Sequence, residues 1–248
     1  MKRFGLIGYP LGHSFSKKYF TEKFEKENIT DCEYELYPLE SLDELPNLIK
    51  SVKGLKGLNV TIPYKEQVLK FLDEIDPKAE QIGAVNIVKI QGKKLIGFNT
   101  DYIGFKESLI KFIGSNPMPE KALILGTGGA SKAVKVVLKD LNIDYNIVSR
   151  NPIEDQISYD SLNTSIPQHL NTHKLIINTT PLGMAPKTES LPDLPYQLLT
   201  TDHFLYDLVY NPMKTAFMQK GIDAHCWVKN GLEMLYGQAE AAWKIWND

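Results

Sequence analysis

Apolar and polar positions along the first hundred residues follow two alternating patterns. Short apolar runs, or runs in which every second residue is apolar, are typical of strands, and apolar residues three and four apart are typical of amphipathic helices. Strands that alternate with helices in this way favour an α/β unit. We expect strands at 3–8, 32–39 and 57–62, helices at 16–28, 41–53 and 64–75, and a hairpin at 84–101 about the turn at 91–93.

The alternation continues in the second half, after a helix at 102–113 and the breaker cluster GSNPMP at 114–119. The strand that follows, KALILG, is of the type found in parallel sheets that are buried on both faces. The second half therefore also predicts an α/β architecture. Strands are expected at 121–126, 145–150, 175–181, 203–210 and 225–230, and helices at 126–141, 213–220 and 231–247.

The composition is that of an ordinary globular protein, with 43% apolar and 23% charged residues in 248. A net charge of -2 gives no reason to expect nucleic acid or an anionic membrane as a partner. The apolar start is broken by Gly5, Gly8 and Pro10, so it does not read as a signal peptide, and no run of about 18 apolar residues predicts a membrane span. We expect a cytoplasmic protein without a metal site, in which the widely separated Cys32 and Cys226 are reduced thiols.

A glycine-rich turn, GTGGA, links the strand at 121–126 to the next helix. Glycines let the backbone turn tightly and approach a pyrophosphate, and the helix N-terminus offers free N–H groups and positive potential to it. The G-x-G-x-x-G fingerprint would have a further glycine where this chain has Ser131. The turn predicts a dinucleotide site, with a purely structural turn as the alternative. Its residues are Gly126, Thr127, Gly128, Gly129 and Ala130.

The end of the following strand indicates which dinucleotide is bound. An acidic residue there holds the ribose 2′-hydroxyl of NAD, whereas an arginine accommodates the 2′-phosphate of NADP. This chain has Ser149, Arg150 and Asn151 at that point, and the planar guanidinium of Arg150 matches a phosphate. The segment therefore favours NADP(H) over NAD(H), with an exposed loop arginine as the alternative.

Polar side chains follow the otherwise apolar strands of the first half. Asn59 and Thr61 share one parity on their strand, and Asn86 and Asp101 occur in GAVN and FNTD. Strand ends in α/β sheets line ligand crevices, so we expect these four side chains to share a site, although each alone is also typical of a turn or cap.

Two hydroxyls, those of Ser14 and Ser16, alternate around Phe15. On an extended segment they would point the same way and could bind a polyol or a carboxylate. The alternative is that a serine caps the helix that begins near residue 17.

Lys65 comes directly after the strand and proline of NVTIPYK, at the predicted start of a helix. A positive charge is unfavourable there, because a helix N-terminus already carries partial positive charge. An ammonium beside a carboxylate can give a proton to an oxygen and recover it from solvent, while the carboxylate holds it in place. We therefore predict Lys65 and Asp101 as a catalytic pair, with a solvated helix lysine as the alternative.

These motifs, in this order, resemble the shikimate dehydrogenase family. The collinear series is GYPLGHSFS, NVTIPYK, GAVN, NTD, GTGGASKA, SR, NTTPLGM, YDLVYNP and GLEMLYGQA, and it covers nearly the whole chain. The resemblance implies a substrate-binding and catalytic α/β domain at 1–101 and a Rossmann-type NADP-binding domain at 102–230, with the active site in the cleft between them. It also implies that a C-terminal helix at 231–248 packs back on the first domain.

The resemblance implies reversible, NADPH-dependent reduction of 3-dehydroshikimate to shikimate, within aromatic amino acid biosynthesis. Hydride would reach the C3 carbonyl, with Lys65 as the acid or base and Asp101 as its partner, in a monomer or homodimer. The substrate would be held by Ser14, Ser16, Asn59, Thr61, Asn86, Asp101, Tyr210 and Gln238. The cofactor would lie against Gly126 to Ala130, Ser149, Arg150, Thr180, Met184, Leu208 and Gly231.

Two departures from the family pattern stand out. The family usually has Asn-Arg-Thr where this chain has Ser149-Arg150-Asn151, which changes part of the 2′-phosphate clamp. The region 151–174 is short and lacks a full crossover helix, so the sheet is expected to be trimmed or irregular at that edge. The alternatives are a quinate/shikimate dehydrogenase, a folate-linked methylene dehydrogenase and a non-catalytic NADP-binding sensor. The serine pair and Gln238 suit a polyhydroxy acid better than a pterin.

Overall fold

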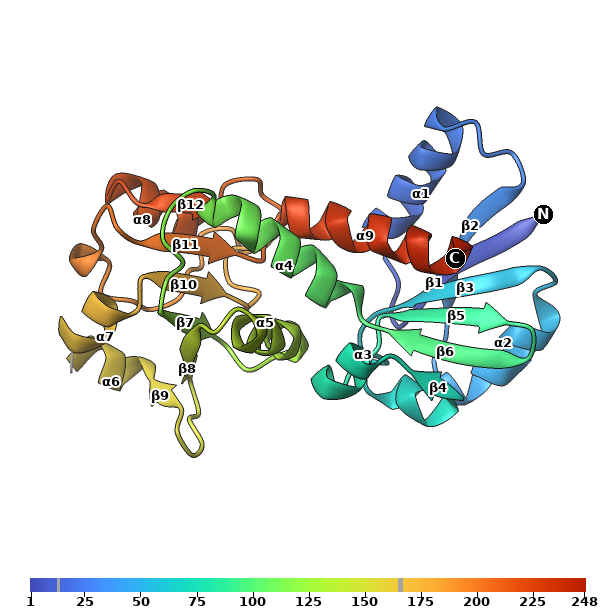
Figure 1. Cartoon of the computed structure of the whole chain (residues 1–248), viewed down its shortest axis with the longest axis horizontal. Helices are drawn as coiled ribbons and strands as arrows, with labels where there is room; N and C mark the ends of the chain where they lie inside the picture. The colour runs from blue at the N-terminus through green and yellow to red at the C-terminus, as the bar shows by residue number, and fades with distance from the viewer. Residues whose placement is uncertain (13, 165–166) are drawn as a thin grey trace. The chain divides into compact units, whose positions relative to one another are not determined.

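The computed structural model describes residues 1–12, 14–164 and 167–248. The chain forms two compact units (Figure 1), of which the first comprises Met1–Ile103 and Gln238–Asp248 and the second Gly104–Gly237. Among the described residues, each unit holds a sheet of six strands with helices around it. The predicted fold class, α/β in both halves, is confirmed.

The sheet of the first unit is mixed and has the order β2-β1-β3-β5-β6-β4. The strand β1 is parallel to its neighbours β2 and β3, whereas β5 is antiparallel to β3 and β6. The expected hairpin is present, since Gln91 pairs with Lys94 and leaves a two-residue turn in which Gly92 has a φ of 65°. The strands are β1 (Lys2–Gly8), β2 (Cys32–Pro38), β3 (Leu55–Val60), β4 (Glu74–Ile75), β5 (Ile87–Gln91) and β6 (Lys94–Phe98).

In the first unit, helices occur where they were predicted at 16–28 and 41–53, and one helix was not predicted. The expected helix at 41–53 divides into a 3-10 turn, Leu42–Glu44, and α2. The addition is α3, which begins at Pro77 and is capped by the Asp76 carboxylate, the acceptor for the N–H groups of Lys78 and Ala79. The bounds are α1 (Phe15–Lys26), α2 (Leu45–Ser51) and α3 (Pro77–Ile82); α4 (Thr100–Ile113) starts here and α9 (Leu232–Asn247) ends here.

The helix predicted at 64–75 is wrong. The segment forms turns, a 3-10 helix at Gln67–Phe71 and then the strand β4. Its apolar side chains do reach the core, as their spacing indicated. However, the backbone N–H groups of Asp73 and Asp76 donate to carbonyls of β6 at 2.9 and 2.8 Å. Pairing with a neighbouring strand therefore wins over a helix, which would gain little stability by itself at this length.

The end of α9 completes the core of the first unit. Trp246 stacks on Phe4 with 4.9 Å between ring centroids, and its Nε1 donates to the carbonyl of Val88 at 3.2 Å. Gly57 on β3 makes room for the indole, because a Cβ there would lie 2.2 Å from Nε1 of Trp246. The last eleven residues are thus built into the unit that holds the N-terminus.

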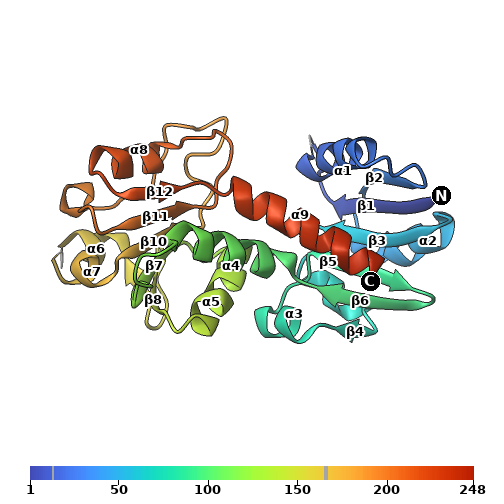
Figure 2. The ribbon, with the colours of Figure 1, turned by 45° about the horizontal axis from the view of Figure 1, so that its top comes forward.

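The sheet of the second unit is wholly parallel, with the order β12-β11-β10-β7-β8-β9, of which Figure 2 labels all strands but β9. Read from β9, this is the Rossmann order 3-2-1-4-5-6, in which ligands bind where the strand order reverses, here between β7 and β10. The strands are β7 (Lys121–Leu125), β8 (Asp144–Ser149), β9 (Ile157–Ser158), β10 (Leu175–Asn178), β11 (Phe204–Asp207) and β12 (Trp227–Lys229). The helices are α5 (Gly129–Asp140), α6 (Tyr159–Thr164), α7 (Pro167–Thr172) and α8 (Ala216–Asp223), with a 3-10 turn at Tyr196–Leu198.

The short region 151–174 forms the β9 edge of this sheet. β9 has two residues, and two six-residue helices, α6 and α7, stand where one full crossover helix was missing from the pattern. Positions 165 and 166 of this region lie outside the described residues. The edge of the sheet is therefore reduced, as the length of the region indicated.

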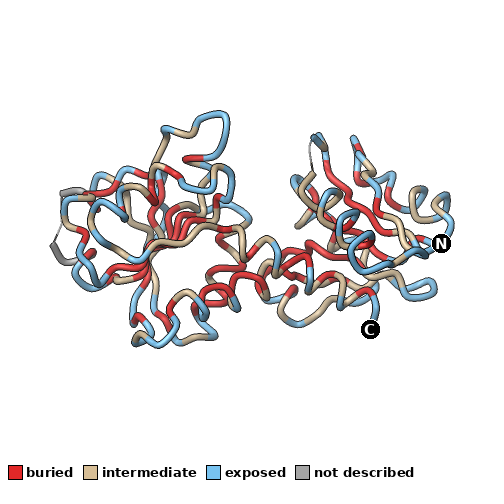
Figure 3. Tube along the Cα trace, turned by 90° about the horizontal axis from the view of Figure 1, so that it is seen from above, coloured by how far each residue is buried: buried red, intermediate tan, exposed pale blue. Residues whose placement is uncertain are grey.

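Burial is most complete along β1, β3, β7, β10 and β11, and buried residues are red in Figure 3. Every residue of β10 and β11 is buried, which explains their apolar runs LII and FLY, and each strand ends in a buried polar residue, Asn178 or Asp207. Cys32 and Cys226 are free thiols, as expected. Within the described part of the chain, no helix is long and apolar enough to cross a membrane, and no cluster of three metal-ligating side chains occurs.

Candidate active site

The register of the first sheet brings several predicted residues to one edge. Asn59 pairs with Ile87, and Ile87 pairs with Phe98. Asn86, which precedes Ile87, therefore lies beside the end of β3, and the segment after Phe98 lies beside Asn86. Backbone bonds close this edge, since the N–H of Val60 donates to the carbonyl of Asn86 at 2.8 Å.

Lys65 and Asp101 meet at this edge of the sheet. The Nζ of Lys65 donates to Oδ2 of Asp101 at 2.6 Å. The two side chains keep 29% and 17% of their surface exposed, so the pair is partly buried but open to solvent. An ammonium in this setting can pass a proton to a bound oxygen and be reprotonated from water.

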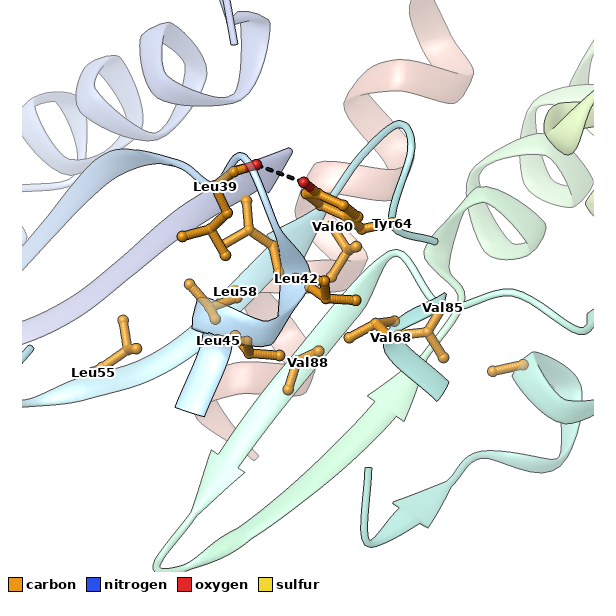
Figure 4. Packing of buried hydrophobic residues seen from close by; sticks show 12 residues of the cluster. Leu39, Leu42, Leu45, Leu55, Leu58, Val60, Tyr64, Val68, Val85 and Val88 are labelled. Atoms are coloured by element: carbon orange, nitrogen blue, oxygen red, sulfur yellow. Dashed lines mark hydrogen bonds between the residues drawn. The ribbon is translucent and has the colours of Figure 1, made fainter. Parts of the chain in front are cut away.

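The backbone around Lys65 is fixed by its neighbours. Tyr64 and Val68 point into the core of the first unit, and the Tyr64 hydroxyl donates to the carbonyl of Leu39 at 2.6 Å (Figure 4). The carbonyl of Lys65 itself accepts from the N–H of Val85 at 2.8 Å. The amine is therefore carried by an anchored turn. The sequence argument that placed Lys65 at a helix N-terminus is wrong, although the residue it singled out does face Asp101.

Asn86 is tied to the start of α4. Its Oδ1 accepts from the N–H of Thr100 at 2.7 Å, and its Nδ2 donates to the Thr100 hydroxyl at 3.1 Å. That hydroxyl also lies 3.5 Å from Oε1 of Gln238. Asn99 begins α4, because its Oδ1 accepts from the N–H of Tyr102 at 3.2 Å. The cap sets the position of Asp101 in the first turn of the helix.

The side chain of Asn59 is fixed by a hydrogen bond from a buried residue that the sequence did not single out. The Tyr34 hydroxyl donates to Oδ1 of Asn59 at 2.6 Å, and Ser16 forms a hydrogen bond with the same phenol. Burial raises the pKa of Tyr34 well above its usual value, so the phenol remains a donor. With Oδ1 occupied, the free groups of Asn59 are the two N–H donors of its amide.

Ser14 has the role that was considered as its alternative, because its hydroxyl accepts from the N–H of Lys17 at 3.4 Å and caps α1. Ser16 lies in the first turn of that helix. Thr61 follows β3 and donates its N–H to Ile7 at 3.0 Å. Its side chain packs on Gly8, where a Cβ would lie 2.4 Å from the Thr61 methyl.

The second unit contains a pocket of about 660 Å³ at the predicted reversal of strand order. Gly126, with a φ of 103°, turns the chain after β7, and Gly128 precedes the first turn of α5 without a side-chain cap. A Cβ on Gly128 or Gly129 would meet no atom within 4 Å, so this helix end is open to a ligand. The lining residues are Gly126, Thr127, Gly128, Val148, Ser149, Arg150, Asn151, Tyr159, Thr179, Thr180, Pro181, Leu182, Leu191 and Asp193.

The departure from the glycine fingerprint is accommodated within α5. Ser131 is buried, and its hydroxyl donates to the carbonyl of Gly128 at 2.7 Å. The larger residue therefore packs under the turn and leaves the helix end open. Gly129 and Ala130 form the first turn of α5 and are not among the lining residues.

Arg150 stands at the rim of this pocket as an exposed cation. Its guanidinium has no hydrogen bond or ion pair with the described residues. Burial raises the pKa of the Tyr159 phenol, and the nearby charge of Arg150 partly opposes this effect. Ser149 is buried and accepts from the N–H of Asn151 at 3.2 Å, which shapes the turn that carries Arg150. Glycine turn and free cation together form a site that fits a dinucleotide phosphate.

The other predicted cofactor residues follow β10, β11 and β12. Thr180 lines the pocket, whereas Met184, Leu208 and Gly231 do not. Gly231 packs directly on Leu208, since a Cβ there would lie 2.1 Å from the Leu208 carbonyl oxygen. Tyr210, expected at the substrate, is 37% exposed in this unit.

Sequence reasoning missed two kinds of residue here. Tyr34 and Thr100 form hydrogen bonds with predicted residues from within the core. Thr100 is part of the motif NTD, next to the predicted Asp101. Tyr159 and Asp193 line the pocket from the irregular segments around β9 and after β10, where no periodic pattern was available.

Comparison with known proteins adds independent observations. Residues 6–88 match the family model described as the shikimate dehydrogenase substrate binding domain. The NADP(+) shikimate dehydrogenase of Desulforamulus reducens is 34% identical over 260 residues, which cover 98% of this chain and 88% of that protein. The chain belongs to the shikimate dehydrogenase family.

Solved structures of family members share the fold. A chorismate mutase/shikimate 5-dehydrogenase fusion protein from Clostridium acetobutylicum has a TM-score of 0.87 at 39% identity, covering 100% of this chain and 91% of that one. Thermus thermophilus shikimate 5-dehydrogenase, in complex with NADP(H) and shikimate, has a TM-score of 0.81 at 30% identity, covering 99% and 93%. Quinate dehydrogenase from Corynebacterium glutamicum, in complex with NAD, has a TM-score of 0.86 at 25% identity, covering 99% and 93%.

Proposed function

We propose that this protein catalyses the reversible, NADPH-dependent reduction of 3-dehydroshikimate to shikimate. The observation that carries the proposal is the partly buried Lys65–Asp101 pair at 2.6 Å, at a sheet edge that also presents Asn59 and Asn86. The relatives that share nearly the whole chain support the same activity, because they are NADP(+) shikimate dehydrogenases.

We assign substrate binding to the first unit. The amide N–H donors of Asn59 and the partly buried, hydroxyl-bearing segment at Ser14 and Ser16 suit an acid with several hydroxyl groups. Thr61, Asn86 and Gln238, with Tyr210 from the second unit, would complete the substrate contacts. In this assignment the catalytic domain is residues 1–101, with the helix at 231–248 packed on it.

We assign NADP to the second unit, residues 102–230. The glycine turn from Gly126 to Gly128 would hold the pyrophosphate at the N-terminus of α5, and Arg150 would pair with the 2′-phosphate. Thr180, Met184, Leu208 and Gly231 would lie along the nicotinamide half. When bound, NADPH supplies the hydride.

The role of the chain's own residues follows from the charge that develops on the substrate. As the C3 carbonyl carbon accepts hydride, its oxygen gains an electron pair and takes a proton from Nζ of Lys65. The resulting neutral amine recovers a proton from solvent, since the lysine remains 29% exposed. In the oxidative direction the same amine receives the C3 hydroxyl proton. Asp101 holds the amine in place and offsets its positive charge.

An assay of two substrates with two cofactors tests the proposal. Purified protein is mixed with shikimate or quinate and with NADP+ or NAD+, and formation of the reduced cofactor is followed by its near-ultraviolet absorbance. We expect shikimate with NADP+ to be turned over most efficiently. Faster turnover of quinate, or a preference for NAD+, would favour a quinate/shikimate dehydrogenase instead. Binding of NADP+ without turnover of either acid would favour a non-catalytic sensor.

We further propose a cytoplasmic enzyme of aromatic amino acid biosynthesis, acting as a monomer or homodimer. This placement follows the family and the reduced thiols, and fractionation of cells with antibody detection would test the location.

A further inference from the structure

The carboxylate of Asp207 is wholly buried at the end of β11, and its hydrogen-bond partners are not among the residues assigned above. It is 0% exposed. Three donors surround it: Nδ2 of Asn178 at 2.9 Å and the N–H of Val209 at 3.0 Å on Oδ1, and the hydroxyl of Thr215 at 2.6 Å on Oδ2. No described lysine, arginine or histidine forms an ion pair with it. A buried charge without a cation is costly, and such groups concentrate where function requires them.

One of these donors connects Asp207 to the dinucleotide pocket. Asn178 is also 0% exposed and ends β10, immediately before the turn that lines the pocket. Its Oδ1 accepts from both the N–H and the hydroxyl of Thr180, at 3.0 and 2.6 Å, and its Nδ2 also lies 3.3 Å from the carbonyl of Leu182. The Thr180 hydroxyl in turn accepts from the N–H of Leu182 at 3.2 Å. The hydrogen bonds of the Asn178 side chain therefore hold this turn in its conformation.

The negative charge of Asp207 determines the orientation of the side-chain amide of Asn178. An ionised carboxylate accepts hydrogen bonds and cannot donate, so the amide nitrogen of Asn178 must point toward Asp207. The amide oxygen must then point toward Thr180, where two donors meet it. A neutral amide at position 207 would present its own N–H donors to Asn178 or Val209 and would remove this constraint. Burial raises the pKa of Asp207 to about 6, which leaves the group ionised at neutral pH.

The hydrogen bond that Thr215 donates to Asp207 connects the carboxylate to the start of α8. The Thr215 hydroxyl accepts from the N–H of Met218 and caps α8. It donates to Oδ2 of Asp207, the oxygen that Asn178 does not contact. The two arms can therefore be separated by mutation, one reaching the pocket through Asn178 and the other reaching α8 through Thr215.

We propose that Asp207 is a positioning residue for the cofactor, which acts through Asn178 to fix the Thr179–Leu182 turn in its binding conformation. The proposal rests on the assignment of NADP to this pocket. It predicts that loss of the charge weakens NADP+ binding far more than it affects shikimate binding, because the turn belongs to the dinucleotide pocket alone.

The test measures NADP+ affinity by titration calorimetry in the wild type and in Asp207→Asn, with Asp202→Asn as the matched control at an exposed position before the same strand. We expect Asp207→Asn to weaken NADP+ binding by about tenfold or more, as for a lost buried bond to a charged group, with Asp202→Asn unchanged. The KM for shikimate at saturating NADP+ should change by less than about twofold. Equal NADP+ affinity in the wild type and Asp207→Asn would overturn the inference, whereas no NADP+ binding by the wild type would overturn the proposed function itself.

Two further variants separate positioning from a general loss of structure. Thr215→Val removes the α8 arm, and we expect it to lower stability while leaving NADP+ affinity within about threefold of the wild type. Asn178→Ala removes the pocket arm, and the double variant with Asp207→Asn should bind NADP+ no more weakly than the worse single variant. Additive losses in the double variant, or an equal loss of affinity in Thr215→Val, would contradict the route through Asn178. If Asp207→Asn does not fold, Asn178→Ala alone decides, and normal NADP+ affinity in that variant rejects the proposal.

Discussion

Individual side chains at the candidate active site depend on partners that lie deeper in the protein. Asn59 presents its amide N–H groups because Tyr34 occupies its oxygen, and Tyr34 is itself held by stacking on Phe20 with 4.7 Å between centroids. Asp101 is placed by the Asn99 cap of α4. The groups that would touch substrate are therefore oriented by buried neighbours.

A Tyr34→Phe variant tests this dependence. The change removes one hydroxyl and keeps the ring and its stacking, so the amide of Asn59 is free to rotate. We expect the KM for shikimate to rise by roughly 3–10-fold, which corresponds to one lost hydrogen bond, while the KM for NADPH stays the same. Steady-state kinetics with each ligand varied in turn would measure both.

Tyr37→Phe on the same strand is the matched control, because Tyr37 is half-buried away from Asn59. Equal changes in both KM values of Tyr34→Phe, or the same change in the control, would argue for a general structural effect.

At the scale of single residues, the sequence predicted those site residues that did not fit their local pattern. Lys65 and Asp101 were found because a cation after a strand and proline, and an acid after a strand, call for an explanation. Tyr34 was not found, because an aromatic residue in an alternating strand looks like any other core residue. Its hydroxyl orients Asn59 through a contact 25 positions away in the chain, which no local pattern reveals.

Among the secondary-structure elements, those with strong periodicity were predicted well and the segment 64–75 was not. The long apolar strands and the amphipathic α5 are determined by their own sequences. The segment at 64–75 has helical spacing, but the hairpin β5–β6 offers it an exposed edge to pair with. Tertiary pairing then decides the outcome, and such pairing cannot be read from one segment alone.

The docking of α9 on β3 gives a test at this scale. Gly57→Ala would place a Cβ 2.2 Å from Nε1 of Trp246, so the indole must shift from its stacking and from its bond to Val88. We expect a loss of about 1–3 kcal/mol in the free energy of unfolding, as for other overpacked cores. Denaturant titration followed by tryptophan fluorescence would measure it.

Gly12→Ala serves as the comparison, since a Cβ there meets no atom within 4 Å. Unchanged stability in Gly57→Ala would show that α9 does not depend on this contact.

The pH dependence of the free energy of unfolding should show the titration of Asp207. Its pKa rises from 3.8 to about 6 on folding because of burial. The folded protein therefore holds this proton more tightly than the unfolded chain, and the resulting stability is present below about pH 4 and is lost as pH rises through 6. Relative to the non-titrating Asp207→Asn variant, the wild type should lose up to about 3 kcal/mol of unfolding free energy between pH 4 and 7.

Denaturant titrations of both proteins across that range would measure the difference, with Asp202→Asn expected to follow the wild type. A difference between Asp207→Asn and the wild type that stays constant with pH would contradict the assigned shift.

For the molecule as a whole, the order of elements was enough to predict two α/β units and the parallel sheet of the second. The glycine turn, the strand that follows and Arg150 line the pocket that we propose for the dinucleotide, and they could be recognised because they are close together in the chain. The support of the pocket by Asn178, Asp207 and Thr215 was not predicted, since it joins the ends of separate strands through side chains that face inward.

The claim on which this account depends is that the amine of Lys65 exchanges a proton with the oxygen that is reduced or oxidised. Turnover of shikimate with NADP+ by Lys65→Ala measures it most directly, beside Lys70→Ala, which removes a lysine from the same segment whose exposed side chain pairs with Asp43. We predict that kcat falls by ~10²–10⁴ in Lys65→Ala, that shikimate binding changes less, and that Lys70→Ala matches the wild type. Wild-type kcat in Lys65→Ala would contradict the account.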